Sequence, residues 1–141
     1  MKNTIFKVSL IILLFIPSNL MSKTEYFEEG LILFKNQKLN EAKFKFEQDI
    51  VFNPKSEMSY LYLSKIFKNL KNKNLEEQNL NTVILLNPKN EEAIYNLAKL
   101  KLEASDYKKS KELNDRLKRL CNKFCEKSKR LNKEIEDLSK K

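Results

Sequence analysis

A period of 34 residues runs through the middle of the chain and constrains its fold more than any other feature. Pro54 and Pro88 are 34 residues apart, each follows an asparagine, and each ends a run with helical spacing. Two further series share this step, namely Tyr26, Tyr60 and Ile94, and Gly30, Ser64 and Ala98. Self-similarity at such a period is typical of stacked helical repeats, in which each repeat buries its apolar face against its neighbours.

Each period contains two apolar runs at helical spacing, separated by a short polar break. In the first period the helices are expected at about residues 23–35 and 40–52, with the break at residues 36–38. One glycine and three prolines in 141 residues argue against a β-rich fold, whose turns need more of both. We therefore predict an all-α chain, a solenoid of about three helix-turn-helix units followed by a long C-terminal helix.

The pattern resembles the tetratricopeptide repeat (TPR), whose units combine aromatic and small residues at fixed places with a closing proline. The resemblance predicts a repeat domain at residues 23–122, with units at 23–56, 57–90 and 91–122, and a basic helical extension at residues 123–141. Small residues are expected where the two helices of a unit cross, because larger side chains would push the axes apart. The repeat-defining residues are Tyr26, Gly30, Ala42, Phe46, Pro54, Tyr60, Ser64, Phe67, Pro88 and Ala98.

Four positions depart from the repeat pattern. Glu29 stands where a leucine is usual, Asp49 and Glu76 stand where small residues are usual, and Asn114 stands where an aromatic residue is expected. The third unit also lacks the closing proline. Loss of the motif fits a terminal unit whose outer face meets water.

The resemblance implies a curved array whose inner groove, lined by the first helix of each unit, takes a segment of a partner protein. The best-known subtype grips a terminal carboxylate with lysines and asparagines, but here Phe27, Leu31 and Tyr62 occupy three of those places. We therefore expect an amphipathic or mildly acidic segment instead. The alternative for Phe27, Leu31 and Met58 is that the leader or neighbouring helices cover them. Carried over by position, the groove residues are Phe27, Leu31, Phe34, Met58, Leu61, Lys65, Lys68, Tyr95, Lys99 and Leu102.

The residue types that support catalysis are scarce. The chain has no histidine, which removes the most common general base and the most common metal ligand. Two cysteines cannot form a four-thiolate zinc site, and the carboxylates are scattered at helix-surface spacing. We expect a non-catalytic protein with no metal and no cofactor.

Residues 1–22 have the pattern of a signal peptide or an N-terminal membrane anchor. Lys2 and Lys7 flank the start of the segment, and the apolar run at residues 8–16 is ended by Pro17. This run of nine residues is too short for an ordinary membrane span, which needs about 20 apolar residues. The cleavage pattern is poor, so cleaved and retained forms both stay open. We expect an exported chain, periplasmic or associated with the envelope membrane of a bacterial cell.

Most of the positive charge lies at the C-terminal end. The formal net charge is +9, and residues 108–141, with 13 Lys plus Arg and 6 Asp plus Glu, contribute +7 of it. No glycine or proline follows Tyr107, and an apolar stripe runs from Leu113 to Leu138. The favoured interpretation is the second helix of unit three, running on as a capping helix over the last repeat. The alternative is a projecting helix that meets a partner or a second copy, giving a homodimer.

The basic face of this C-terminal segment is also compatible with an anionic membrane surface or nucleic acid. Nucleic acid is not favoured, because its binding surfaces usually interleave arginines and stacking aromatic residues with the lysines. A solvated face on a lysine-rich chain is the simpler interpretation. The main expected partner is therefore another protein.

Cys121 and Cys125 are four residues apart in this segment. In a regular helix their Cβ atoms would lie about 6 Å apart, whereas a disulfide needs roughly 3.5–4.5 Å. A bond would require a distorted turn around residues 122–124. Two separate thiols are the favoured interpretation, and a disulfide is the alternative.

Overall fold

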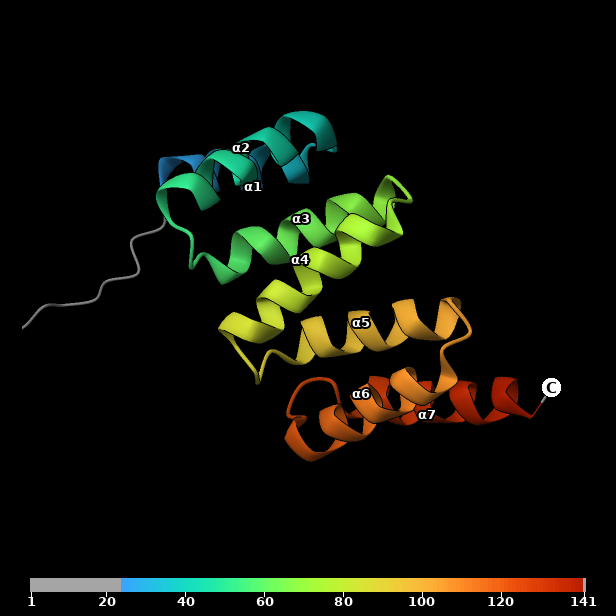
Figure 1. The fold of residues 1–141 in the computed structure, drawn as a ribbon. Coiled ribbons are helices and arrows are strands. Elements are labelled where there is room, and N and C mark those ends of the chain that lie inside the picture. The colour runs from blue at the N-terminus through green and yellow to red at the C-terminus, as the bar shows by residue number, and fades with distance from the viewer. Residues whose placement is uncertain (1–23, 141) are drawn as a thin grey trace, which may run out of the picture.

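The computed structural model describes residues 24–140, and this part of the chain is an array of helix pairs without strands. The pairs α1–α2, α3–α4 and α5–α6 stack one after another, and α7 packs on the last pair (Figure 1). The predicted all-α repeat solenoid is confirmed. The helices are α1 (Glu25–Lys35), α2 (Leu39–Phe52), α3 (Glu57–Asn69), α4 (Lys73–Leu86), α5 (Glu91–Glu103), α6 (Tyr107–Leu120) and α7 (Cys125–Ser139).

The two helices within each pair are joined by the same type of turn. The chain reverses through a residue in the left-handed region, with φ values of 61° at Gln37, 56° at Lys71 and 61° at Ser105. These positions are again 34 residues apart.

Three of the helices are capped by side chains. Asn72, Asn90 and Asp106 accept a hydrogen bond from the third backbone N–H of α4, α5 and α6, which satisfies a donor left unpaired at a helix start.

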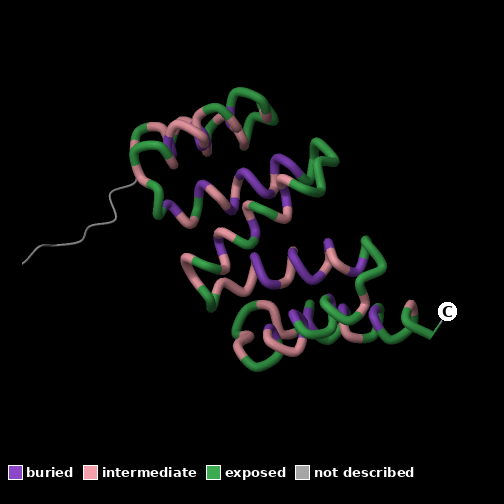
Figure 2. The backbone as a smooth tube through the Cα atoms, viewed as in Figure 1, coloured by how far each residue is buried: buried purple, intermediate pink, exposed green. Residues whose placement is uncertain are grey.

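The apolar core is divided into two clusters along the array, on the faces where neighbouring helices meet (Figure 2). The cluster of the first pair and α3 is rich in aromatic residues. The cluster around α5 is mostly aliphatic and extends into α7. The first contains Phe27, Ala42, Phe46, Leu63, Ile66 and Phe67, and the second includes Leu80, Val83, Ile94, Leu97, Ala98, Leu117, Leu131 and Ile135.

Small residues lie where paired helices approach each other, as predicted. A Cβ added to Gly30 would lie 2.9 Å from Cε1 of Phe46, so α1 and α2 cross without room for a side chain. In the third pair the hydroxyl of Ser110 donates to the carbonyl of Ala98 across 2.8 Å. The close approach of α5 and α6 is therefore fixed by a buried hydrogen bond as well as by small size.

The other repeat-defining residues are also placed by the structure. Ala42 and Phe46 are fully buried and Phe67 is buried. Tyr26 stacks on Phe52 with ring centroids 5.3 Å apart, and Tyr60 packs on the second cluster. Three residues remain, with Ser64 buried and donating to the Leu61 carbonyl, and Pro54 and Pro88 exposed in the turns after α2 and α4.

The C-terminal segment is two helices, so the prediction of one long helix was wrong. α6 ends at Leu120, residues 121–124 form a turn, and α7 folds back against α6 and α5. Leu131 and Ile135 are only 1% and 3% exposed. The capping interpretation is confirmed, and the alternative of a projecting helix is wrong because its apolar stripe is buried within the chain.

None of the helices within residues 24–140 combines the length and the apolar character that crossing a membrane requires. The predicted signal peptide or anchor at residues 1–22 lies outside the described residues.

Candidate partner-binding groove

The first helices of the three units, α1, α3 and α5, contact one another in sequence through their side chains, and α7 continues the row. Phe34 of α1 meets Tyr62 of α3 edge-on, with ring centroids 5.1 Å apart. Lys65 of α3 pairs with Glu92 of α5 at 2.8 Å, and Lys99 of α5 pairs with Glu134 of α7 at 2.9 Å. The side of the array formed by α1, α3, α5 and α7 is called the groove face below.

Three of the predicted groove residues are core residues. Phe27, Leu61 and Leu102 are 3%, 2% and 5% exposed. Phe27 packs between Phe46 and Tyr62, and the two leucines belong to the second cluster. The prediction that these side chains offer surface to a partner was wrong for Phe27 and Leu102, because they pack into the core clusters, and Leu61 lines only the floor of the cleft described below.

The predicted groove lysines serve mainly as links between helices. Lys65 lies over the ring of Tyr62, 4.8 Å from its centroid, in addition to pairing with Glu92. Lys99 is held by Glu134. Lys68 is exposed, and no described residue forms an ion pair with it. Of the three lysines, only Lys68 is uncommitted on the described part of the groove face.

The remaining predicted residues give the groove face an apolar surface. Leu31 and Phe34 are half-buried at its α1 end, packed on the first cluster. Met58 is 42% exposed at the start of α3. Tyr95 is half-buried on α5 and meets Phe124 at 5.6 Å between ring centroids. The aromatic and aliphatic side chains thus run along successive first helices.

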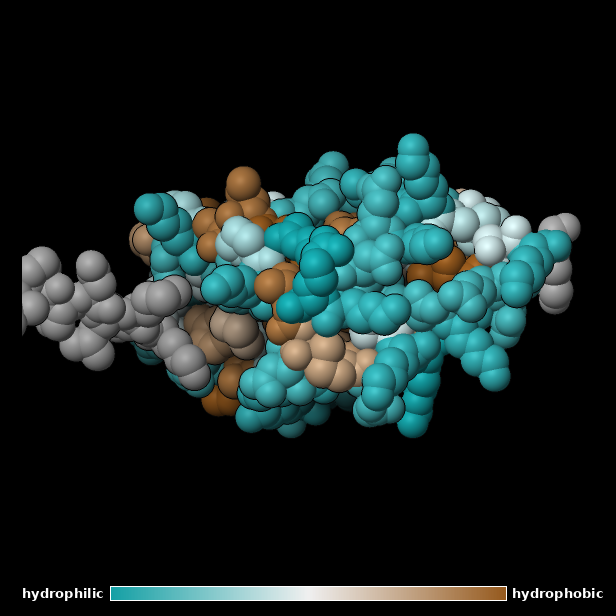
Figure 3. Space-filling view, turned by 90° about the horizontal axis from the view of Figure 1, so that it is seen from below, coloured by the Kyte–Doolittle hydropathy of each residue, from teal (hydrophilic) through white to brown (hydrophobic). Residues whose placement is uncertain are grey.

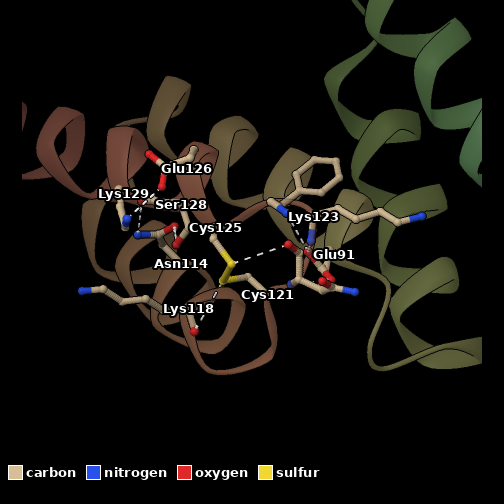
Figure 4. Close-up of a disulfide and its surroundings, with 11 residues drawn as sticks. Glu91, Asn114, Lys118, Cys121, Lys123, Cys125, Glu126, Ser128 and Lys129 are labelled. Carbon is tan, nitrogen blue, oxygen red and sulfur yellow. Dashed lines mark hydrogen bonds and ion pairs between the residues drawn. A yellow bond between two sulfur atoms is a disulfide. The ribbon is translucent and has the colours of Figure 1, made fainter.

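The turn between α6 and α7 is fastened to the start of α5 by a single carboxylate. Glu91 accepts hydrogen bonds from the backbone N–H groups of Asn122, Lys123 and Phe124 at 2.9, 2.9 and 2.8 Å (Figure 4). Successive N–H groups that converge in this way form an anion-binding nest. Desolvation by itself raises the pKa of Glu91, but the three hydrogen bonds and the nearby charge of Lys123 outweigh it and lower the pKa below its usual value.

A disulfide between Cys121 and Cys125 closes this turn. The favoured prediction of two thiols was wrong, because the backbone leaves the helix at residues 121–124 and brings the Cα atoms to 5.1 Å. The distorted turn that a disulfide requires is therefore present, and it places Lys123 and Phe124 next to α5.

An open cleft of about 320 Å³ lies on the groove face where α3, α5 and this turn meet. Met58 and Leu61 come from α3, and Lys123 and Phe124 come from the turn. Lys89, Lys123 and Phe124 were not predicted as site residues, because the sequence pattern gave no sign that a turn at residues 121–124 would bring them together. The full lining is Met58, Leu61, Lys89, Asn90, Glu91, Glu92, Lys123 and Phe124.

The face of the molecule seen from below is mostly hydrophilic (Figure 3). Figure 3, which views the molecule from below relative to Figure 1, shows a largely hydrophilic face with hydrophobic side chains in separate patches. Among residues 24–140, no three His, Cys, Asp or Glu side chains are grouped so that they could hold a metal ion.

Comparison with known proteins adds to this geometry. No family model and no curated protein matches the sequence. Solved structures match the fold. The first TPR domain of Spaghetti (RPAP3), bound to the HSP90 peptide SRMEEVD, has a TM-score of 0.72 at 19% identity, covering 81% of this chain and 90% of that one.

Two further structures are similar over most of their length. The type III secretion chaperone SycD of Yersinia enterocolitica, in complex with a peptide of the translocator YopD, has a TM-score of 0.72 at 16% identity, covering 82% of this chain and 92% of that one. The Arabidopsis OM64 TPR domain has a TM-score of 0.67 at 22% identity, with coverages of 77% and 92%.

The stacked helix pairs and the groove face define a helical-repeat solenoid. Its fold is that of tetratricopeptide-repeat domains, as the resemblance in the sequence predicted.

Proposed function

We propose that this protein is a non-catalytic adaptor that binds a segment of a partner protein on its groove face. The observation that carries the proposal is the row of partly exposed apolar side chains on successive first helices, which includes Phe34, Met58 and Tyr95. Two proteins with the same fold hold peptides, one from HSP90 and one from a translocator. A solenoid presents such a row as one extended binding surface.

The chemistry of the groove face favours an amphipathic segment over a bare terminal carboxylate. Lys65 and Lys99 are held by Glu92 and Glu134, which lowers their availability to a carboxylate ligand. Apolar residues interrupted by uncommitted lysines match a segment with apolar anchors and a few acidic residues.

Photo-crosslinking tests this proposal with a matched pair of positions. Phe34 lies on the groove face, whereas Phe44 lies on α2 and is 57% exposed. Replacing each in turn with p-benzoylphenylalanine conserves an aromatic side chain. A partner should be crosslinked in cells from position 34 and not from position 44. Equal crosslinking from both positions, or crosslinking from position 44 alone, would contradict the groove as the binding site.

We further propose that the protein is exported, with residues 1–22 as a signal peptide or membrane anchor. The Cys121–Cys125 disulfide supports this proposal, because disulfides persist mainly in oxidising compartments outside the cytosol. Cell fractionation combined with the intact mass of the chain tests it. Recovery from the envelope or periplasm with an oxidised mass supports export, and a chain found wholly in the cytosol with two free thiols refutes it.

A further inference from the structure

The cleft between α3, α5 and the α6–α7 turn combines an apolar base with a charged rim. Leu61 lies buried at its base, and Met58 and Phe124 form its apolar sides. The ring of Phe124 packs against Tyr95, and the ammonium of Lys127 lies over both rings, 4.3 Å from the Phe124 centroid and 5.5 Å from the Tyr95 centroid. The base is therefore pre-organised to accept an apolar side chain.

The two carboxylates in the cleft keep their negative charge, but both are already engaged by donors of the protein itself. Glu91 is engaged by the three backbone N–H groups of the turn. Glu92 pairs with Lys65. Both carboxylates belong to the lining, and their oxygens already accept from protein donors.

The two lysines of the cleft are not paired in this way. Lys89 and Lys123 are exposed, and no described residue lies within ion-pair distance of either ammonium. Lys123 belongs to the five-residue loop closed by the disulfide, which fixes the position of its backbone beside Glu91 (Figure 4). The cleft thus presents an apolar base, the ammonium of Lys89, and the ammonium of Lys123, whose charge also acts on Glu91.

We propose that this cleft binds an apolar side chain of the partner segment together with an acidic residue next to it. The inference rests on the proposed function, and it names the chemistry that the groove face selects at one place. The apolar side chain enters between Met58 and Phe124, and the neighbouring carboxylate meets Lys89 and Lys123. The opposite charge at that position is disfavoured, because a lysine there would face two like charges.

Two short peptides test the proposal by NMR titration of the 15N-labelled full chain with its disulfide closed. The probes are acetyl-Gly-Leu-Asp-Gly-amide and acetyl-Gly-Leu-Lys-Gly-amide. The aspartate peptide should bind about three- to tenfold more tightly at low salt, since two exposed charge pairs are modestly favourable. Its chemical-shift changes should centre on Met58, Lys89 and the backbone of residues 122–124.

A charge-reversed variant guards against effects on folding. In Lys89→Glu/Lys123→Glu the preference should invert toward the lysine peptide, which a merely unfolded chain cannot produce. The control Lys108→Glu/Lys111→Glu makes the same charge change on the exposed side of α6 and should keep the preference for aspartate. Equal binding of both peptides by the unmodified chain, shift changes elsewhere, or an unchanged preference in the reversed variant would overturn the proposal.

Failure of the cleft proposal can be distinguished from failure of the proposed groove function. If position 34 crosslinks the partner but the peptides do not discriminate at the cleft, the groove stands and the cleft assignment fails. If position 34 does not crosslink while the cleft still selects the aspartate peptide, the extended groove fails and the cleft remains.

Discussion

Asn114 of α6 and Ser128 of α7 are joined by two hydrogen bonds in the buried interior. The amide of Asn114 donates to the carbonyl of Ser128 across 3.1 Å, and the hydroxyl of Ser128 donates back to the amide oxygen across 2.9 Å. Both residues are fully buried. The position that departs most from the repeat pattern in unit three is therefore the one that fastens the capping helix.

Removing this pair should loosen the cap. Asn114→Ala leaves the buried hydroxyl of Ser128 without its acceptor, and such a loss costs about 1–3 kcal/mol of the free energy of unfolding. Urea denaturation measures the change. Asn132→Ala, which removes an exposed hydrogen bond to Glu136 on the same helix, should cost less than about 0.5 kcal/mol. Equal costs for the two variants would mean that the pair does not hold α7.

Gly30 offers a test of the close crossing of α1 and α2. Because a Cβ there already lies 2.9 Å from Phe46, Gly30→Leu should overpack the first unit and lower the free energy of unfolding by about 1–3 kcal/mol. Ile32→Leu, at an exposed position two residues along the same helix, is the control and should be close to neutral. Thermal unfolding followed by circular dichroism compares them, and a neutral Gly30→Leu would contradict the crossing.

Glu76 makes stability depend on pH. Burial raises its pKa, partly opposed by Lys68, so the folded state disfavours the ionised form. The folded chain is then most favoured below the unfolded pKa, and stability falls as pH rises from there through the raised folded pKa. Glu76→Gln should raise the Tm at pH 7 and change it less at pH 4. A variant whose Tm is lower than that of the parent at pH 7 would contradict this effect.

The disulfide should contribute measurably to stability although its loop is short. Closing a loop of five residues restricts the unfolded chain by an amount that corresponds to about 2 kcal/mol. Cys121→Ser/Cys125→Ser should lose roughly that amount in denaturant unfolding, and amides of α7 should exchange faster with deuterium. Adding reductant should reproduce the loss in the parent and have no effect on the variant. Identical unfolding of the oxidised and reduced parent would contradict a structural role.

The left-handed residue of the second unit allows a stabilising substitution. Lys71 has a φ of 56°, a conformation that costs about 1–2 kcal/mol for a residue with a Cβ. Lys71→Gly removes this cost but adds freedom to the unfolded chain, so we expect a net gain of about 0.5 kcal/mol. Lys73→Gly, placed at the start of α4 instead, should not stabilise. The midpoint of urea unfolding compares the two variants.

The sequence allowed the repeat and its helices to be predicted because the features that specify them are local. Pro54, Pro88 and the spacing of small and aromatic residues act within one unit. Asp49 shows the limit of that approach. It departs from the small-residue pattern, yet it is buried and accepts hydrogen bonds from the hydroxyls of Thr24 and Ser59. Only the three-dimensional arrangement explains why a carboxylate is accommodated there.

The candidate site was less predictable for a related reason. The turn that ends α6 is held by Glu91, which lies about 30 residues earlier in the chain. It is also closed by the Cys121–Cys125 disulfide, whose geometry a regular helix would not allow. Within residues 107–140 the only local sign of a break is the cysteine pair, which would need a distorted turn at residues 122–124 if it formed a disulfide, and two thiols were the favoured interpretation. The sequence indicated which helices carry the groove residues, but not which side of each helix faces the groove. Phe27 and Leu61 were therefore included although they are buried.

Hydrogen–deuterium exchange of the chain with its crosslinked partner tests the central claim most directly. If the partner segment lies on the groove face, added protection should appear on α1, α3 and α5 and at the α6–α7 turn, and α2 and α4 should be unchanged. Protection confined to α2 and α4, with the first helices unaffected, would contradict the account.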